Sequence, residues 1–278
     1  MPSVTLENRA RIAITGEDAE HFLQNLITTD LSNLPEGEIW PGALLTPQGK
    51  ILFDFLIGRQ DGGFLIELAG DNADAFIRRL TLYRLRAKVN FERLEGSEIS
   101  VIWGVPQAQD GFLDHRFDLA GVAVHRVAGP RGSDHRALYD ALRFEHGIVG
   151  GGEDGPLGDY FPHDLLMDKN GGLSFKKGCY VGQEVVSRMQ HRSTARRRVA
   201  RIRSDASLIG QGAVIATDGK EVGTLIGSQD RTGLAVVRID KVGAALARGH
   251  AVLVEGQPVS VTLPVWAGLS FPTDAEEA

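Results

Sequence analysis

The sequence contains a single cysteine and no long apolar run. Cys179 is the only cysteine among 278 residues, which excludes an intrachain disulfide, a cysteine-pair zinc site and a C-x-x-C redox motif. No uncharged segment reaches the length of a membrane span, and the first eleven residues show no apolar stretch behind a basic start. The histidines lack metal-ligand spacing. We therefore expect a cytoplasmic protein with no membrane contact and no resident metal.

Acidic residues are missing from one stretch of the chain. The net charge is −6, yet no aspartate or glutamate occurs between Glu184 and Asp205. Seven arginines lie in that gap: Arg188, Arg192, Arg196, Arg197, Arg198, Arg201 and Arg203. Such a local basic stretch favours one anion-facing surface, with Arg188, Arg192 and Arg197 as candidate contacts to carboxylates or to RNA phosphates. The alternative for each arginine is an ordinary solvated charge.

The first half of the chain mixes strand and helix patterns. Lys50–Gly58 and Phe64–Leu68 have strand character, and Asp61-Gly62-Gly63 between them predicts a hairpin. A helical stripe of apolar residues begins after Asp71 and continues to about Arg86. We therefore expect a region of helices and antiparallel sheet.

The pattern changes in the last third of the chain. From about Arg198 onward, short apolar runs alternate with turn residues, which is typical of a small β-barrel or sandwich. We predict an α+β chain with two intertwined subdomains over residues 1–195 and a β-barrel over residues 196–272. The acidic residues 273–278 are expected to form a frayed tail.

The single cysteine lies in a segment suited to a reactive thiol. Glycines flank it in Lys176-Lys177-Gly178-Cys179-Tyr180-Val181-Gly182, so the backbone is free to turn. The two lysines place cations nearby, and both features favour an accessible thiolate with a lowered pKa. The alternative is that Cys179 is a small buried apolar residue.

Two carboxylates occupy positions that the patterns predict to be buried. Asp54 shares a strand face with Leu52 and Leu56, so it is expected to line a pocket as an acid or base, or else to pair with an arginine. Glu145 continues a helical stripe from Leu138 and needs a buried partner, unless it reaches solvent or an arginine. Tyr139 on the same helix is a candidate stacking residue, although packing is the simpler explanation.

Several segments of this chain together resemble one known family. Lys177-Gly178-Cys179-Tyr180-Val181-Gly182-Gln183-Glu184 resembles the K-G-C-F/Y-x-G-Q-E signature of the YgfZ/GcvT-like family. Further similarities are Phe22-Leu23-Gln24 with Thr28 and Asp30, Leu45-Thr46-Pro47-Gln48-Gly49-Lys50, and Leu263-Pro264-Val265-Trp266. The resemblance covers nearly the whole chain.

The resemblance implies a folate ligand and a link to iron–sulfur proteins. Relatives include the tetrahydrofolate-dependent T-protein of the glycine cleavage system, mitochondrial iron–sulfur assembly factors, and bacterial proteins that support a tRNA methylthiolation enzyme. Arg143-Phe144-Glu145-His146-Gly147 resembles the T-protein R-L-E-x-G segment, whose glutamate binds the pterin. By this resemblance Glu145, Arg143, Tyr139 and Asp54 would bind folate, and Cys179, Lys177 and Asp54 would carry the chemistry.

Three functions follow from these observations. The first is a folate-dependent accessory protein that uses Cys179 in iron–sulfur cluster assembly or repair, acting with partner proteins because one thiolate cannot supply four cluster ligands. The second is a one-carbon transferase, although Phe55 stands where T-proteins carry a second carboxylate. The third is a tRNA-binding modification factor that uses the arginine run.

Overall fold

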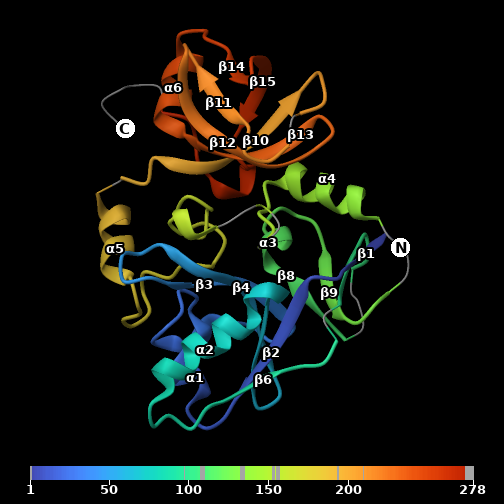
Figure 1. The fold of residues 1–278 in the computed structure, drawn as a ribbon, viewed down its shortest axis with the longest axis vertical. Helices are drawn as coiled ribbons and strands as arrows, with labels where there is room; N and C mark the ends of the chain where they lie inside the picture. The colour runs from blue at the N-terminus through green and yellow to red at the C-terminus, as the bar shows by residue number, and fades with distance from the viewer. Residues whose placement is uncertain are drawn as a thin grey trace.

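The computed structural model describes residues 2–96, 98–106, 110–131, 135–151, 154, 157–192, 194–208 and 210–272. The predicted tail, residues 273–278, lies outside them. Figure 1 shows a mixed body with a barrel stacked on one end of it. The strands of the body are β1 (Ser3–Leu6), β2 (Arg9–Thr15), β3 (Glu38–Leu45), β4 (Ile51–Gln60), β5 (Gly63–Ala69), β6 (Asn90–Arg93), β7 (Ile99–Trp103), β8 (Gly111–Asp114) and β9 (Val124–Ala128). Its helices are α1 (Ala19–Gln24), α2 (Ala73–Arg84), α3 (His115–Asp118), α4 (Arg136–His146) and α5 (Gln183–His191).

The strands of the body form one sheet. Within the described residues the order is β1-β7-β9-β8-β3-β4-β5-β2-β6, and neighbours are antiparallel except for the short parallel pair β3 and β8. The predicted hairpin is confirmed as β4 and β5, with Gln60 opposite Gly63. Gly62 lies in the turn with φ 77°, a left-handed conformation that glycine adopts without steric cost.

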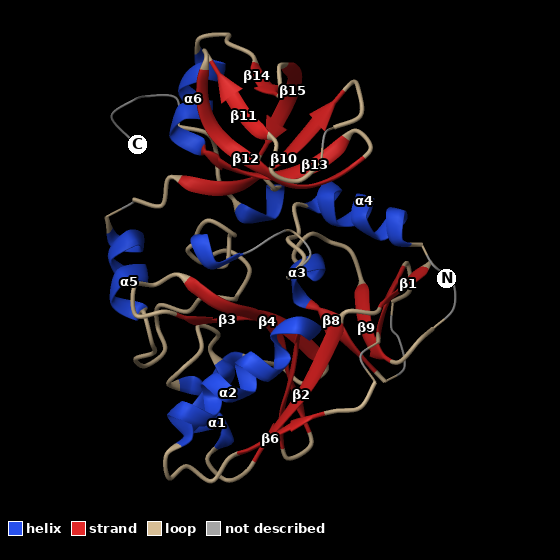
Figure 2. Cartoon of the chain, in the orientation of Figure 1, coloured by secondary structure: helices blue, strands red, loops and turns tan. Residues whose placement is uncertain are grey.

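Helices α1 and α2 cover the part of the sheet formed by β2, β4 and β5 (Figure 2). Their apolar side chains share one buried cluster with the strands, including Phe22, Leu23, Ile57, Phe76 and Leu80. Helix α2 ends at Arg84, earlier than the sequence pattern predicts, because Leu85 takes a positive φ that no α-helix allows. The helix therefore stops at an exposed turn.

The C-terminal strands close into a barrel. Its elements are β10 (Arg197–Ser204), β11 (Val214–Thr217), β12 (Lys220–Gln229), β13 (Thr232–Arg238), α6 (Ile239–Ala247), β14 (Val252–Val254) and β15 (Gln257–Thr262). The strand order β10-β13-β12-β11-β14-β15 confirms the predicted α+β architecture with a small barrel. Body and barrel meet in an apolar cluster that includes Phe144, Leu165, Tyr180, Val199 and Leu234. No helix in the described part of the chain is long and apolar enough to cross a membrane.

Candidate functional site

The segment around Cys179 is a loop with buried residues on both sides of an exposed tip. Lys177 and Tyr180 are 8% and 6% exposed, whereas Gly178 and Cys179 face solvent. The Tyr180 hydroxyl donates to the Ser174 carbonyl oxygen at 3.3 Å, and burial raises the pKa of the phenol. The predicted accessibility of Cys179 is confirmed. Its thiol is presented by a loop that is fixed at both ends.

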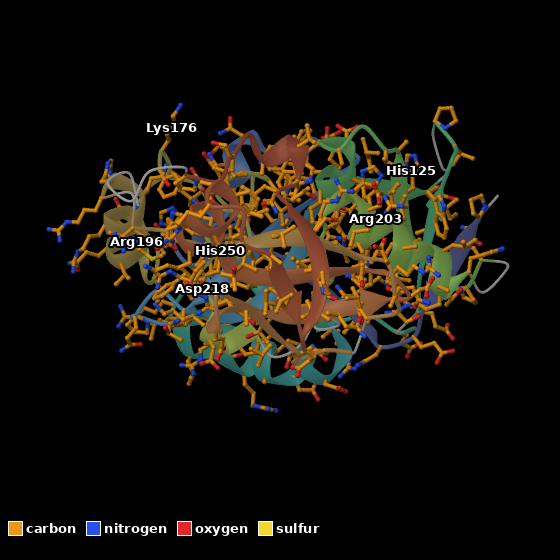
Figure 3. All side chains as sticks on the ribbon, turned by 90° about the horizontal axis from the view of Figure 1, so that it is seen from above. His125, Lys176, Arg196, Arg203, Asp218 and His250 are labelled. Carbon is orange, nitrogen blue, oxygen red and sulfur yellow. The ribbon has the colours of Figure 1, made fainter. Side chains whose placement is uncertain are left out.

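Lys177 anchors this loop from below. Its Nζ donates to the carbonyl oxygens of Ile27 at 2.9 Å and Thr29 at 2.6 Å. Burial lowers the pKa of Lys177 to about 8, although the Asp30 carboxylate opposes this shift. This ammonium is therefore engaged by the backbone, and the prediction that Lys177 takes part in the chemistry of the thiol stays a prediction. The neighbouring Lys176 instead extends into solvent (Figure 3).

Two of the segments that carry the family resemblance pack against each other. Gly182 precedes α5 with φ 81°, and a Cβ on it would lie 2.6 Å from the Thr46 carbonyl oxygen. Gly49 has φ 79°, and a Cβ on it would lie 3.0 Å from the Cβ of Val185. Both positions therefore suit glycine in conformation and in space. The turn before β4 thus supports the start of α5, directly after the thiol loop.

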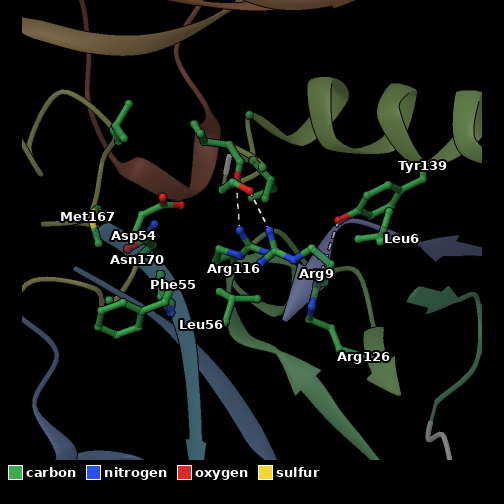
Figure 4. Close-up of a pocket in the computed structure, with 18 of the residues that line it drawn as sticks. Leu6, Arg9, Asp54, Phe55, Leu56, Arg116, Arg126, Tyr139, Met167 and Asn170 are labelled. Carbon is green, nitrogen blue, oxygen red and sulfur yellow. Dashed lines mark hydrogen bonds between the residues drawn. The ribbon is translucent and has the colours of Figure 1, made fainter. Parts of the chain in front are cut away.

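A cavity lies between the sheet, the loop after α4 and the segment that follows the barrel (Figure 4). Its apolar lining includes Leu6, Phe55, Leu165, Met167 and Trp266. Its polar lining includes Arg9, Asp54, Arg116, Arg126, Tyr139 and Asn170. Among the described residues, Cys179 is not part of this lining. The thiol and the cavity are therefore separate features.

Asp54 lines the cavity from strand β4. Burial raises the pKa of its carboxyl group, against the attraction of Arg9 and Arg116. Those two arginines form their ion pairs elsewhere, with Glu67 and Asp114. The Asp54 carboxyl is thus near positive charge without an ion pair to either arginine, a state suited to contact with a ligand.

Sequence reasoning missed a buried network of charges behind the cavity. Glu67 accepts hydrogen bonds from Arg9 Nε at 2.8 Å and Arg126 Nε at 2.7 Å. Burial alone would raise the pKa of Glu67, but Arg126 and Arg9 together lower it to about 2. Asp114 accepts two bonds from Arg116, at 2.9 and 2.6 Å. The sequence did contain one sign of this network, because Glu67 is the only charged residue in the otherwise apolar strand β5.

The same arginines hold the loop that covers the cavity. Arg116 Nη1 donates to the Val149 carbonyl oxygen at 2.9 Å, and Arg9 Nη1 donates to that of Gly151 at 2.7 Å (Figure 4). A Cβ on Gly151 would lie 2.1 Å from Asp54 Oδ2, so the loop passes close to the carboxyl group. The buried arginines therefore hold the strands that line the cavity and also the loop after α4 that covers it.

Helix α4 buries a different face from the predicted one. Tyr139 and Phe144 are buried, whereas Leu138 is 56% exposed. The Glu145 side chain is 51% exposed and pairs with Arg201 of the barrel at 2.6 Å. The prediction of a buried Glu145 is wrong because the helix packs through its Tyr139 side and turns the Leu138 stripe outward.

The other two folate-binding candidates on α4 are buried. Tyr139 lines the cavity, and its hydroxyl accepts a hydrogen bond from Arg126 Nη1 at 3.4 Å. Arg143 Nη1 donates to Asp154 Oδ2 at 2.8 Å, and the same oxygen accepts from the Gly150 amide at 2.6 Å. Arg143 is not among the cavity-lining residues described, so it acts as a support for the covering loop.

The arginine run does not form one anion-facing surface. The structure gives most of its members separate partners in the fold: Arg188 with Glu184 at 2.6 Å, Arg197 over the Tyr160 ring at 5.0 Å, Arg198 with Asp168 at 2.7 Å and Arg201 with Glu145. Arg192 is exposed after α5. Figure 3 shows Arg196 and Arg203 far apart. Within β10 only Arg198 faces the opposite side from Arg197, Arg201 and Arg203, and the run is divided because its members contact different parts of the fold, which counts against the prediction of a single anion-facing surface.

Comparisons of sequence connect the chain to iron–sulfur assembly factors. The family model "CAF17, C-terminal beta-barrel domain" matches residues 196–269. An iron–sulfur cluster assembly factor IBA57 homolog, mitochondrial, from Pyricularia oryzae is 30% identical over 220 residues, which cover 70% of this chain and 55% of that relative. The human IBA57 factor is 29% identical over 306 residues, covering 94% of this chain and 84% of the relative. The chain thus spans little more than half of the fungal relative's length.

Comparison of structure defines the fold. The glycine cleavage system aminomethyltransferase T from Bartonella henselae matches with a TM-score of 0.66 and 17% identity, covering 98% of this chain and 86% of that protein. The body and barrel therefore have an aminomethyltransferase-like fold. Within that class, the chain belongs to the IBA57/CAF17 (YgfZ-like) family.

Proposed function

We propose that this protein is a folate-binding accessory factor that supports iron–sulfur cluster assembly or repair through Cys179, with enzymes of tRNA modification among its clients. The observation that carries the proposal is the exposed thiol on a loop anchored by Lys177 and Tyr180. Within the described residues, no group of three or more His, Cys, Asp or Glu side chains can hold a metal ion. Cys179 therefore acts together with iron–sulfur proteins or their assembly factors, in a cytoplasm that keeps the thiol reduced.

Tetrahydrofolate or another folate is the ligand that we assign to the cavity. The carboxyl group of Asp54 suits the adjacent N–H donors of a pterin's amino-pyrimidine edge. Phe55, Tyr139 and Trp266 supply flat apolar surfaces for the ring. A bound folate would supply a one-carbon carrier. In this proposal Asp54 takes the pterin-binding role that the resemblance to T-proteins implies for Glu145.

Titration of tetrahydrofolate against two carboxylate variants tests this assignment. We expect Asp54→Asn to weaken binding by about tenfold or more, since an amide cannot replace two acceptor oxygens. Glu145→Gln is the matched control, and its affinity is expected to stay within about twofold of wild type because Glu145 lies outside the cavity. The absence of wild-type binding in the micromolar range, or equal losses in both variants, would contradict the assignment.

The role of Cys179 is tested in cells that lack the endogenous protein. Wild type is expected to restore iron–sulfur enzyme activity, and Cys179→Ala is expected to fail while accumulating to the same level. Lys176→Ala serves as a control because that neighbouring side chain extends into solvent. Full restoration by Cys179→Ala would refute the proposal.

A second candidate is a folate-dependent one-carbon transferase. The cavity carboxyl of Asp54, with its raised pKa, favours this alternative because such a group can move a proton. Phe55 in place of a second carboxylate counts against it. Turnover of tetrahydrofolate with an aminomethyl donor, lost in Asp54→Asn and retained in Cys179→Ala, would establish the transferase. The division of the arginine run leaves tRNA binding with little support.

A further inference from the structure

The turn after helix α2 combines two unfavourable features at Leu85. The backbone of Leu85 has φ 44° and ψ −104°, and the Ala87 amide donates to the Arg84 carbonyl oxygen at 2.8 Å across the turn. This geometry is that of the first central position of a type II′ turn, which glycine dominates. The Leu85 side chain is also 90% exposed. Backbone strain and apolar exposure therefore coincide at one residue.

The fold explains the turn but not the leucine. Lys88 is fixed to the loop before α1, because its amide donates to Asp18 Oδ2 at 2.8 Å. A Cβ on Gly16 would lie 2.1 Å from the Lys88 carbonyl oxygen, so the two segments are in close contact. The chain must turn between the helix end and this anchor within three residues. Glycine at position 85 would make the same turn without strain, so leucine indicates a role outside the folded chain.

The sequence around Leu85 is basic and contains a second exposed leucine, whereas Glu17 and Asp18 contact Lys88 from the loop before α1. Leu82, three residues earlier on α2, is 69% exposed. No acidic residue occurs from Ala75 to Phe91, although the whole chain carries −6. That interval contains five basic residues, namely Arg78, Arg79, Arg84, Arg86 and Lys88. Figure 1 shows α2 running away from the barrel, which places this turn at the opposite end of the molecule.

We propose that Arg78, Leu82, Leu85 and Arg86 form a docking surface for an acidic protein segment that carries apolar side chains. Arg78 and Arg86 are exposed and make no ion pair with the described residues, so they can meet partner carboxylates. Burial of Leu82 and Leu85 against the partner supplies the favourable contact that the free chain lacks.

A protein partner fits this surface better than a lipid bilayer or RNA. An interfacial helix needs a broad apolar face, but Phe76 and Leu80 of α2 are buried in the core, which leaves two leucines for the outside. RNA would engage the cations and would leave the leucines without an apolar counterpart. The surface shares no described residue with the cavity lining, so it does not depend on a bound folate.

Fluorescence anisotropy with a labelled helical peptide of leucine and glutamate tests the proposal on the full chain. We expect saturable, salt-sensitive binding that Leu85→Gly weakens by about fivefold or more and Arg86→Gln by about twofold to threefold. Leu138→Ala and Arg203→Gln, changes at other exposed sites, are expected to have no effect on the affinity. Leu85→Gly is also expected to keep or raise the thermal unfolding midpoint, because it removes the strain.

Several outcomes would overturn the proposal. One is the absence of peptide binding, and another is equal binding by wild type and Leu85→Gly. A lower unfolding midpoint for Leu85→Gly would show that the leucine serves the fold instead. Tighter binding to phosphatidylserine vesicles or to duplex RNA than to the peptide, with the same dependence on Leu85 and Arg86, would assign the surface to those partners.

Discussion

The thiol loop and the cavity use buried charge in opposite ways. In the loop, two backbone carbonyls hold the Lys177 ammonium, and Cys179, two residues further along, faces solvent. Behind the cavity, Arg9 and Arg126 hold Glu67, while Asp54 remains outside the ion pairs and faces the cavity. The thiol that we propose to act on other proteins thus lies on the surface, and the carboxyl group suited to a small ligand lies inside.

The largest expected effect comes from breaking the charge network behind the cavity. Glu67→Gln leaves Arg9 and Arg126 buried without their carboxylate, so we expect a loss of about 3–5 kcal/mol in the free energy of unfolding. The exposed pair of Glu184 and Arg188 provides the control, since Glu184→Gln is expected to cost less than about 1 kcal/mol. Urea denaturation measures both. Similar losses in the free energy of unfolding for Glu67→Gln and Glu184→Gln would show that the buried ion pairs of Glu67 do not stabilise the cavity.

Removal of the loop anchor is expected to have an intermediate effect. Lys177→Met leaves the buried carbonyls of Ile27 and Thr29 without a donor, which we expect to cost about 1.5–3 kcal/mol. Lys176→Met, at an exposed site, should change the free energy of unfolding by less than about 0.5 kcal/mol. Equal losses in the two variants would contradict the anchoring role of Lys177.

The stability difference between wild type and Lys177→Met is also expected to depend on pH. Its pKa is about 8 in the folded protein, below the ordinary 10.5, so the unfolded chain binds this proton more tightly. Below pH 8 the folded state carries the full free-energy cost of burying the charged Lys177 ammonium. Between about pH 8 and 10.5 the folded protein loses this proton while the unfolded chain keeps it, so that cost disappears. The stability of wild type relative to Lys177→Met is therefore expected to rise across this interval. A flat difference would show that Lys177 does not titrate there.

The smallest expected effect is at Asp54. Because burial raises the pKa of this carboxyl group in the folded protein, its contribution to stability is greatest at low pH and is lost as the pH rises through the folded value. At pH 7, above the pKa of an unfolded aspartate, the buried carboxyl group therefore lowers stability, so Asp54→Asn should raise the free energy of unfolding by up to about 1 kcal/mol. Chemical denaturation at pH 4 and pH 7 checks that the increase in the free energy of unfolding caused by Asp54→Asn is larger at pH 7. A decrease at pH 7 would indicate that Asp54 forms a stabilising ion pair.

Local patterns predicted the elements that depend on neighbouring residues. The turn sequence around Gly62 fixed the β4–β5 hairpin, and the glycines around Cys179 correctly indicated an exposed loop. The orientation of α4 was not predictable in this way, because it depends on how Tyr139 packs with residues of β1, β7 and β9, which are distant in sequence. Likewise, the network around Glu67 joins residues far apart in sequence, and no local period reveals such pairings.

The surface thiol and the cavity that we propose to bind folate are separate parts of the structure. The affinity of Cys179→Ser for tetrahydrofolate tests it most directly, measured beside wild type by calorimetric titration. The separation seen in the structure predicts dissociation constants equal within about twofold, because Cys179 is not part of the cavity lining. A loss of affinity of tenfold or more in Cys179→Ser would contradict it.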